Sequence, residues 1–271
     1  MLEKLPSVEN KRDGHDDIEA SKAPLIEHLI ELRSRLIWAL CAFFVMFLVC
    51  FYFAGHIYNV LVWPYEWASG DQGVRLIATH FLEQIMTQMR LALFGAGFLS
   101  FPVVATQIYK FVAPGLYKNE RGAFLPYLIA TPVLFMIGAA VVYFIAMPVL
   151  IRFSISLAHA GGTAQHQIEL LPKVSEYLSL IMSLIFGFGL CFQLPVVLTL
   201  LARAGIVSSE GLSSKRRFAI VGIFTAAAVL APPDALSMVI MALPTVILYE
   251  VSILAVKYVE RSQAAKRAAE S

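Results

Sequence analysis

The apolar residues of this chain lie in long, nearly uninterrupted blocks, and this distribution limits its fold more than any other feature. A block of about 20 apolar residues forms a helix that spans a bilayer, because its backbone amides must bond within the segment where water is absent. Hydrophobic residues make up 59% of the 271 positions and charged residues 15%, a balance unlike that of soluble domains. The sequence therefore predicts an all-α membrane protein.

Six segments are candidates for spanning helices. Four are clear, at residues 37–55, 90–112, 126–150 and 177–201, and an amphipathic stretch from Phe81 extends the second of them. The third and the fourth each contain an internal proline, which we expect to kink a helix in a packed bundle rather than to end it.

The remaining apolar stretch, residues 218–257, is interrupted by Ala231-Pro-Pro-Asp234, and a proline pair followed by an acid predicts a turn. We expect two helices here; one long helix with a proline kink is the alternative. The first of the two has about 14 residues and a length of roughly 21 Å, whereas the hydrocarbon core is about 30 Å thick. Helices five and six are therefore predicted to be short, beside a thinned membrane or on a concave, shortened side of the bundle.

Lysine and arginine residues predict the orientation. Of the 21, 17 lie in the two tails and in the connections between spans two and three and between spans four and five. Because cytoplasmic loops carry an excess of Lys and Arg, both termini are predicted to be cytoplasmic. Residues 24–258 then form one six-helix membrane domain, and residues 1–23 and 259–271 are predicted to be disordered cytoplasmic tails.

Composition and motifs exclude several classes of function. A formal charge of +2 without a single basic patch argues against nucleic-acid binding. The chain has no glycine loop for phosphates, no His and Cys pairs at metal-ligand spacing and no serine elbow, so we expect no metal, no cofactor and no enzyme.

Several motifs resemble the TatC family, the polytopic subunit of the twin-arginine protein translocase. His28-Leu-Ile-Glu-Leu-Arg-Ser-Arg-Leu36 resembles the N-terminal signature of that family, and Phe111-Val-Ala-Pro-Gly-Leu-Tyr-Lys-Asn-Glu-Arg121 is similar to its first cytoplasmic loop. Pro64 falls where the family has a proline in its first external loop. Ala231-Pro-Pro-Asp234 and Phe192-Gln-Leu-Pro195 match later landmarks, so the resemblance covers residues 24–258.

The resemblance implies a receptor and scaffold subunit. It would bind twin-arginine signal peptides at the cytoplasmic face of a bacterial inner membrane and recruit single-span subunits of the TatA and TatB type. It would export folded proteins with the proton-motive force, and it would associate with further copies of itself. The lack of a nucleotide site agrees with this expectation.

Recognition of two guanidinium groups calls for carboxylates, because a forked donor matches carboxylate oxygens bidentately. By resemblance, Glu31 and Glu120 contact the arginine pair. Other residues of the two motifs would shape the same surface; these are Arg33, Phe111, Pro114, Leu116 and Arg121. The alternative is that Glu31 only pairs with Arg35, and Glu120 with Lys118 or Arg121, as weak solvated ion pairs.

Two polar residues lie inside predicted spans. Gln193 is a candidate for docking a partner helix, or else for an ordinary interhelical hydrogen bond. The family often has a glutamate there, and a neutral amide cannot relay protons as a carboxylate would. Glu250 is a functional candidate as an intramembrane acid, unless a link to Lys257 satisfies it.

The external side has its own candidates. Trp63, Tyr65 and Trp67 predict an interfacial aromatic belt. With Pro64 and the loop around Glu83, they would form the external cap of the family. Asp234 is placed to cap the sixth helix.

A secondary transporter of a small solute is the rival function, with Gln193 and Glu250 lining a midplane site. Such transporters are built from internal repeats, and this sequence shows none. An intramembrane enzyme is disfavoured because no paired catalytic residues are present.

Overall fold

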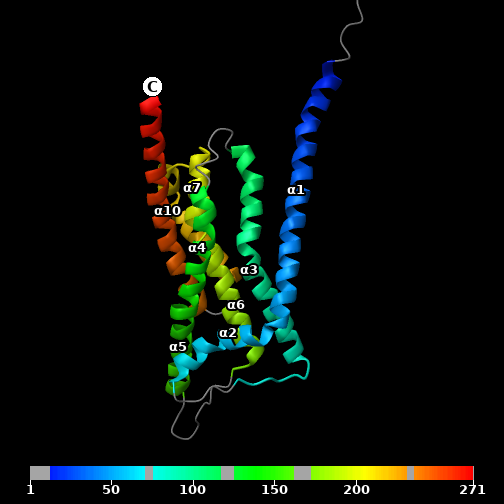
Figure 1. The fold of residues 1–271 in the computed structure, drawn as a ribbon. Helices are drawn as coiled ribbons and strands as arrows, with labels where there is room; N and C mark the ends of the chain where they lie inside the picture. Colours follow the sequence, from blue (N-terminus) through cyan, green and yellow to red (C-terminus); the bar gives the residue numbers. More distant parts are fainter. Residues whose placement is uncertain (1–12, 71–75, 117–124, 162–171, 231–234, 271) are drawn as a thin grey trace, which may run out of the picture.

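The computed structural model of the chain describes residues 13–70, 76–116, 125–161, 172–230 and 235–270. Helices account for nearly all of this part, and an isolated bridge between Ile77 and Lys173 is its only β-type pairing (Figure 1). The elements in chain order are α1 (Asp13–Tyr52), α2 (Ala54–Ser69), α3 (Glu83–Leu116), α4 (Leu125–Val141), the π-helical turn η3 (Val142–Ala146), α5 (Met147–Gly161), α6 (Val174–Cys191), α7 (Leu194–Arg203), α8 (Ser209–Ser214), α9 (Arg216–Leu230) and α10 (Ala235–Glu270).

Five helical stretches of the described chain are long and apolar enough to cross a membrane. They are Leu29–Tyr52, Glu83–Phe111, Pro126–Ala158, Val174–Arg203 and Ala235–Ala265. This confirms the all-helical, multi-span class and the first four predicted spans. The fifth predicted span corresponds to α9, whose 15 residues give a length of about 22 Å. A sixth crossing of the membrane stays a prediction.

The third and fourth spans continue past their internal prolines, as predicted, although a short turn divides the fourth into two helices. In the third, α4 passes through Pro132 and continues by way of η3 into α5, where Pro148 follows. Pro148 has no N–H to bond four residues back, and the wider π turn lies there. In the fourth, a short turn at Phe192 and Gln193 separates α6 from α7, and Pro195 lies in the first turn of α7.

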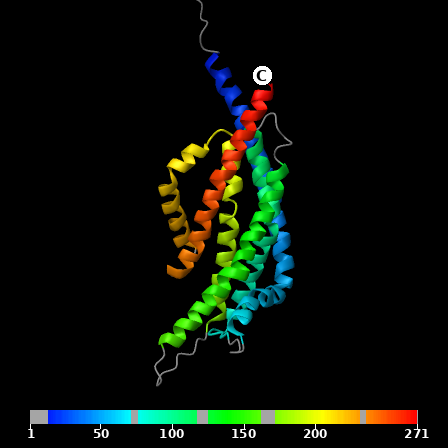
Figure 2. The same cartoon turned by 90° about the vertical axis from the view of Figure 1, so that its left-hand side faces the viewer.

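The last apolar stretch forms two helices, α9 and α10, that lie side by side (Figure 2). The predicted split is therefore confirmed, and one kinked helix is wrong. The predicted shortness holds for α9 but is wrong for α10, which has 36 residues.

Each predicted tail contains helix. The structure continues α10 to Glu270, because the alanine-rich residues after 258 are strong helix formers. It likewise begins α1 at Asp13, within a tail that was expected to be disordered. Residues 1–12 lie outside the described part.

One side of the bundle is shortened. Figure 2 shows α9 and the start of α10 stopping well before the end of α5. A pocket of about 970 Å³ lies there, and Phe153 and Leu157 of α5, Leu180 of α6 and Leu236 of α10 are among its lining residues. The bundle is therefore hollowed on the side where the sequence predicts a short helix.

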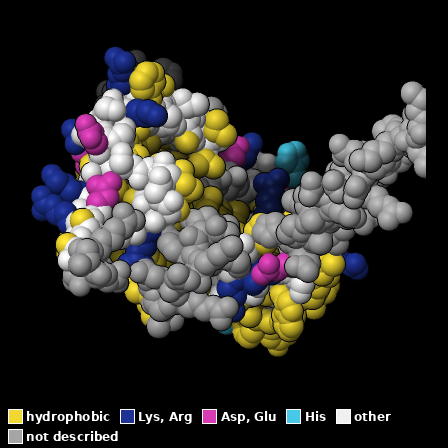
Figure 3. All heavy atoms as spheres, turned by 90° about the horizontal axis from the view of Figure 1, so that it is seen from above, with side chains coloured by type: hydrophobic (Ala, Val, Ile, Leu, Met, Phe, Trp, Pro, Cys, Tyr) yellow, Lys and Arg dark blue, Asp and Glu magenta, His cyan; other side chains and the backbone are white. Residues whose placement is uncertain are grey.

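The beginning of α1 and the end of α10 lie at the same end of the molecule (Figure 1). Seen from that end, Lys and Arg side chains are spread over the surface (Figure 3). Both features agree with termini on one side of a membrane. That this side is the cytoplasm stays a prediction.

Candidate functional site

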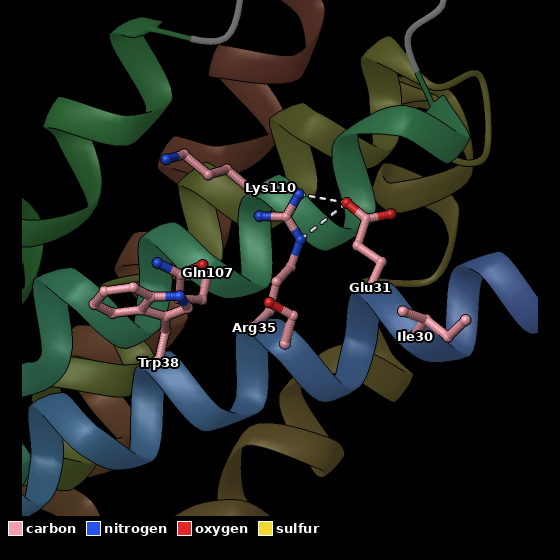
Figure 4. Close-up of a pocket in the computed structure, with 7 residues that line it drawn as sticks. Ile30, Glu31, Arg35, Trp38, Gln107 and Lys110 are labelled. Carbon is pink, nitrogen blue, oxygen red and sulfur yellow. Dashed lines mark hydrogen bonds and ion pairs between the residues drawn. The ribbon is translucent and has the colours of Figure 1, made fainter.

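A groove lies between α1 and α3, nearer to the end of the bundle that carries both termini (Figure 4). Its volume is about 530 Å³, and its lining residues are Ile30, Glu31, Ser34, Arg35, Trp38, Gln107 and Lys110. The groove is therefore built around Glu31, the residue that the sequence singles out for guanidinium binding.

α1 and α3 pack closely at the end away from the groove. A Cβ atom on Gly95 of α3 would lie 2.8 Å from Cys50 Sγ of α1, so the missing side chain lets the two helices approach closely. Figure 1 shows them separating from that contact toward the groove.

Helical periodicity brings the polar residues of the groove together. Glu31, Arg35 and Trp38 follow one another at four and three residues on α1, and such positions share a face of a helix. Gln107 and Lys110, three residues apart on α3, face them. The sequence motif contained Glu31, but Trp38, Gln107 and Lys110 were missed, because only the α1–α3 packing shows that they line the groove.

Glu31 is paired with Arg35. Both Nε and Nη2 of the guanidinium donate to Glu31 Oε1, the Nε bond having a length of 3.0 Å. The side chains of Glu31 and Arg35 are 34% and 23% exposed, so the pair is partly open to water. The pairing that was the alternative to ligand binding is therefore formed.

The other residues predicted to contact the signal peptide do not line this groove in the described part of the chain. Arg33 is exposed on α1 and does not line the groove. Phe111 is partly buried directly after Lys110, and Pro114 and Leu116 belong to the last two turns of α3. Glu120 and Arg121 lie outside the described residues. The described groove thus holds one acid, Glu31, which can bind one guanidinium.

Gln193 is 8% exposed and joins two spans. Its Nε2 donates to the carbonyl oxygen of Thr131 at 3.0 Å, which links the turn between α6 and α7 to α4. The Thr131 hydroxyl lies 2.9 Å from the carbonyl oxygen of Tyr127 and 3.0 Å from the hydroxyl of Tyr109 on α3. An interhelical hydrogen bond, one of the two predicted roles, is therefore formed.

The other polar atom of the Gln193 amide is unpaired. Its Oε1 is buried and has no hydrogen-bond partner within the described chain. A buried acceptor without a donor costs free energy, so Gln193 is only partly satisfied by its neighbours.

Glu250 of α10 pairs with Arg216, the first residue of α9, at 2.9 Å. Arg216, and not Lys257 as in the alternative interpretation, is the ion-pair partner of Glu250, because α9 folds back against α10 and brings Arg216 close. The pair therefore ties the two last helices together. Asp234 lies outside the described residues, so its capping role stays a prediction.

The aromatic segment after α1 forms a helix, α2, that packs across the bundle. Tyr177 donates to the carbonyl oxygen of Leu61 at 2.8 Å, and Tyr143 donates to that of Val60 at 2.7 Å. Trp63 stacks on Tyr143 with ring centroids 5.8 Å apart. Pro64 is buried inside α2. These contacts hold α2 at the end opposite the termini, where the sequence predicts the external cap.

Glu83 joins this cap to α6. Its Oε2 accepts from the backbone N–H of Thr79 at 2.6 Å, and its Oε1 accepts from the hydroxyl of Ser175 at 2.6 Å. The adjacent bridge adds bonds from the Ile77 amide to Pro172 and from the Val174 amide to Ile77. Both carboxylate oxygens of Glu83 therefore serve as hydrogen-bond acceptors that hold this junction together.

We expect Glu83→Gln to loosen this junction, because an amide accepts fewer and weaker hydrogen bonds than a carboxylate. Hydrogen exchange of the Thr79 and Ser175 amides should become severalfold faster. Glu66→Gln, the same change at an exposed position of α2, is the control and should leave both amides protected. Equal exchange in the two variants would contradict the role of Glu83.

Among the described residues, no group of three or more His, Cys, Asp or Glu side chains is placed to hold a metal ion.

Comparison with known proteins gives a consistent result. The family model of TatC, the Sec-independent protein translocase protein, matches residues 27–244. A TatC protein of Magnetococcus marinus is 43% identical over 254 residues, which cover 94% of this chain and 91% of that protein. The TatC protein of Escherichia coli is 37% identical over 230 residues, with coverage of 85% and 86%.

A solved structure is also similar. A crystal structure described as the twin-arginine translocase receptor TatC superimposes with a TM-score of 0.76 at 35% identity, covering 86% of this chain and 99% of that one. Fold and sequence therefore agree on one family.

Proposed function

Because the chain belongs to the TatC family of Sec-independent protein translocase proteins, we propose that it is the receptor and scaffold subunit of a twin-arginine translocase. It binds twin-arginine signal peptides on the cytoplasmic face of a bacterial inner membrane. It recruits single-span subunits of the TatA and TatB type through its helices. The proton-motive force drives export of the folded cargo, and the chain itself catalyses no bond chemistry.

The observation that carries this proposal is Glu31 in the groove between α1 and α3. Its side chain is about one third exposed, and its Oε2 has no hydrogen-bond partner within the described chain. A planar guanidinium that enters from solvent can engage both oxygens, and such charge-assisted pairs are the strong ones. The groove therefore suits one arginine of a peptide.

The second arginine needs a second acid. Lys110 and Arg35 are the other charged residues that line the groove, and both are cations. Glu120 follows Lys110 by ten positions, in the segment after α3. We propose that it supplies the second carboxylate, with Phe111, Pro114, Leu116, Arg33 and Arg121 shaping the surface around it.

Gln193 and the hollowed side support partner recruitment. Gln193 is a polar residue inside a span whose Oε1 has no hydrogen-bond partner within the described chain, and we propose that it lies close to the partner-binding surface. The largely apolar pocket lined by α5, α6 and the start of α10 offers a surface to an apolar helix. The transporter alternative is not favoured, because Gln193 and Glu250 are held by different neighbours, Thr131 and Arg216, rather than at one site.

The proposal is tested by peptide binding to the full chain in lipid nanodiscs. A signal peptide with two consecutive arginines should bind at least about tenfold more tightly than the same peptide with two lysines, since lysine cannot pair bidentately. Equal affinities, or no binding of the arginine peptide, would refute the assignment.

A further inference from the structure

The groove contains a guanidinium of the chain itself. Arg35 pairs with Glu31, the acid that we propose for the first arginine of the signal peptide. Ligand and internal partner have the same functional group, so both cannot pair fully with one carboxylate.

We propose that Arg35 is an internal competitor that holds Glu31 until an arginine of the signal peptide displaces it. This inference rests on the proposed function. It makes Arg35 a residue that sets the affinity of the receptor rather than one that binds the ligand.

The geometry of the pair favours exchange. Figure 4 shows both bonds from Arg35 meeting the same oxygen of Glu31, while the other oxygen points away. Arg35 is attached four residues along the same helix and approaches from the side. A guanidinium on a separate peptide can approach end-on and take both oxygens, which is the stronger arrangement.

The exposure of the pair also favours exchange. With 34% and 23% of the two side chains exposed, water screens the attraction, and single ion pairs of this kind at (i, i+4) are weak. A ligand that contributes a second arginine and further backbone contacts has enough affinity to displace such a partner.

After displacement, the Arg35 side chain can contact a second partner, the indole ring of Trp38. Trp38 lies three residues beyond Arg35 on the same face of α1 and is 67% exposed. A guanidinium over an indole ring is stabilised by a cation–π contact. The chain uses this arrangement elsewhere, because Arg152 lies 5.4 Å from the ring centroid of Trp67.

Binding of two peptides to the full chain in nanodiscs tests the inference. The probes are a signal peptide with two consecutive arginines and its two-lysine counterpart. Arg35→Gln removes the competitor. Lys110→Gln is the matched control, since it removes one positive charge from the same groove but no contact to Glu31.

We expect Arg35→Gln to bind the arginine peptide about two- to fivefold more tightly than Lys110→Gln does. This ratio of dissociation constants corresponds to the free energy of one exposed ion pair. The lysine peptide should gain by the same factor, because a competitor lowers the affinity of every ligand that needs Glu31 equally. Binding by Arg35→Gln that is no tighter than binding by Lys110→Gln would overturn the inference. Failure of the unmodified chain to bind the arginine peptide would instead overturn the proposed function.

Discussion

Replacing Glu31 and Glu120 together by alanine should abolish cross-linking of a twin-arginine signal to this chain, while the protein remains inserted in the membrane. Each substitution removes a carboxylate that would make charge-assisted bonds to one guanidinium, at a cost of about 1.5–3 kcal/mol. Together they should weaken binding by about 100-fold or more, since about 1.4 kcal/mol corresponds to tenfold. A photoreactive group in the signal peptide reports the loss.

Two acidic residues at the end of the bundle opposite the termini provide the control for this experiment. Glu66 on α2 and Glu176 on α6 are exposed, and their double replacement by alanine changes the net charge equally. Cross-linking should survive that change. Undiminished cross-linking in the Glu31 and Glu120 variant would remove the basis for the receptor assignment.

The helical class and the places of most spans could be predicted from sequence, because the bilayer imposes one requirement on every span. Apolar blocks and the Ala231-Pro-Pro-Asp234 break located the cores of the observed helices, but α1, α5 and α10 each extend more than ten residues beyond the predicted bounds. Where a helix leaves the membrane, hydropathy stops being informative. The length of α10 was missed for this reason, since alanine-rich helix propensity and not burial continues it to Glu270.

The candidate site was predicted only in part. Motif resemblance led to Glu31, whose partner Arg35 at (i, i+4) follows from helical spacing alone. Contacts between helices could not be read from the sequence, because they depend on which faces pack. Gln107 opposite Glu31, Arg216 opposite Glu250 and Ser175 opposite Glu83 are of this kind.

The packing of α4 against α6 depends on glycines at the contact, and Gly138→Ala should be the most destabilising small substitution in the bundle. A Cβ atom at Gly138 would lie 2.8 Å from the carbonyl oxygen of Phe188 and 3.1 Å from the backbone nitrogen of Gly189. These are backbone atoms of a packed helix, so they cannot turn aside as a side chain could. The two helices must separate, and small residues are what allow membrane helices to approach closely.

Overpacking of this kind costs about 1–3 kcal/mol, so we expect the thermal midpoint in detergent to fall by about 4–8 °C for a loss of about 2 kcal/mol. Gly222→Ala in α9 is the matched control, because nothing lies within 4 Å of a Cβ atom there. In the interior of a helix that change should be neutral or should stabilise by up to about 1 kcal/mol. Equal thermal midpoints for the two variants would mean that α4 and α6 do not pack as closely at Gly138 as the structure shows. Separation of α4 from α6 in Gly138→Ala should also weaken the Gln193–Thr131 hydrogen bond, since that bond joins α4 to the turn that follows α6.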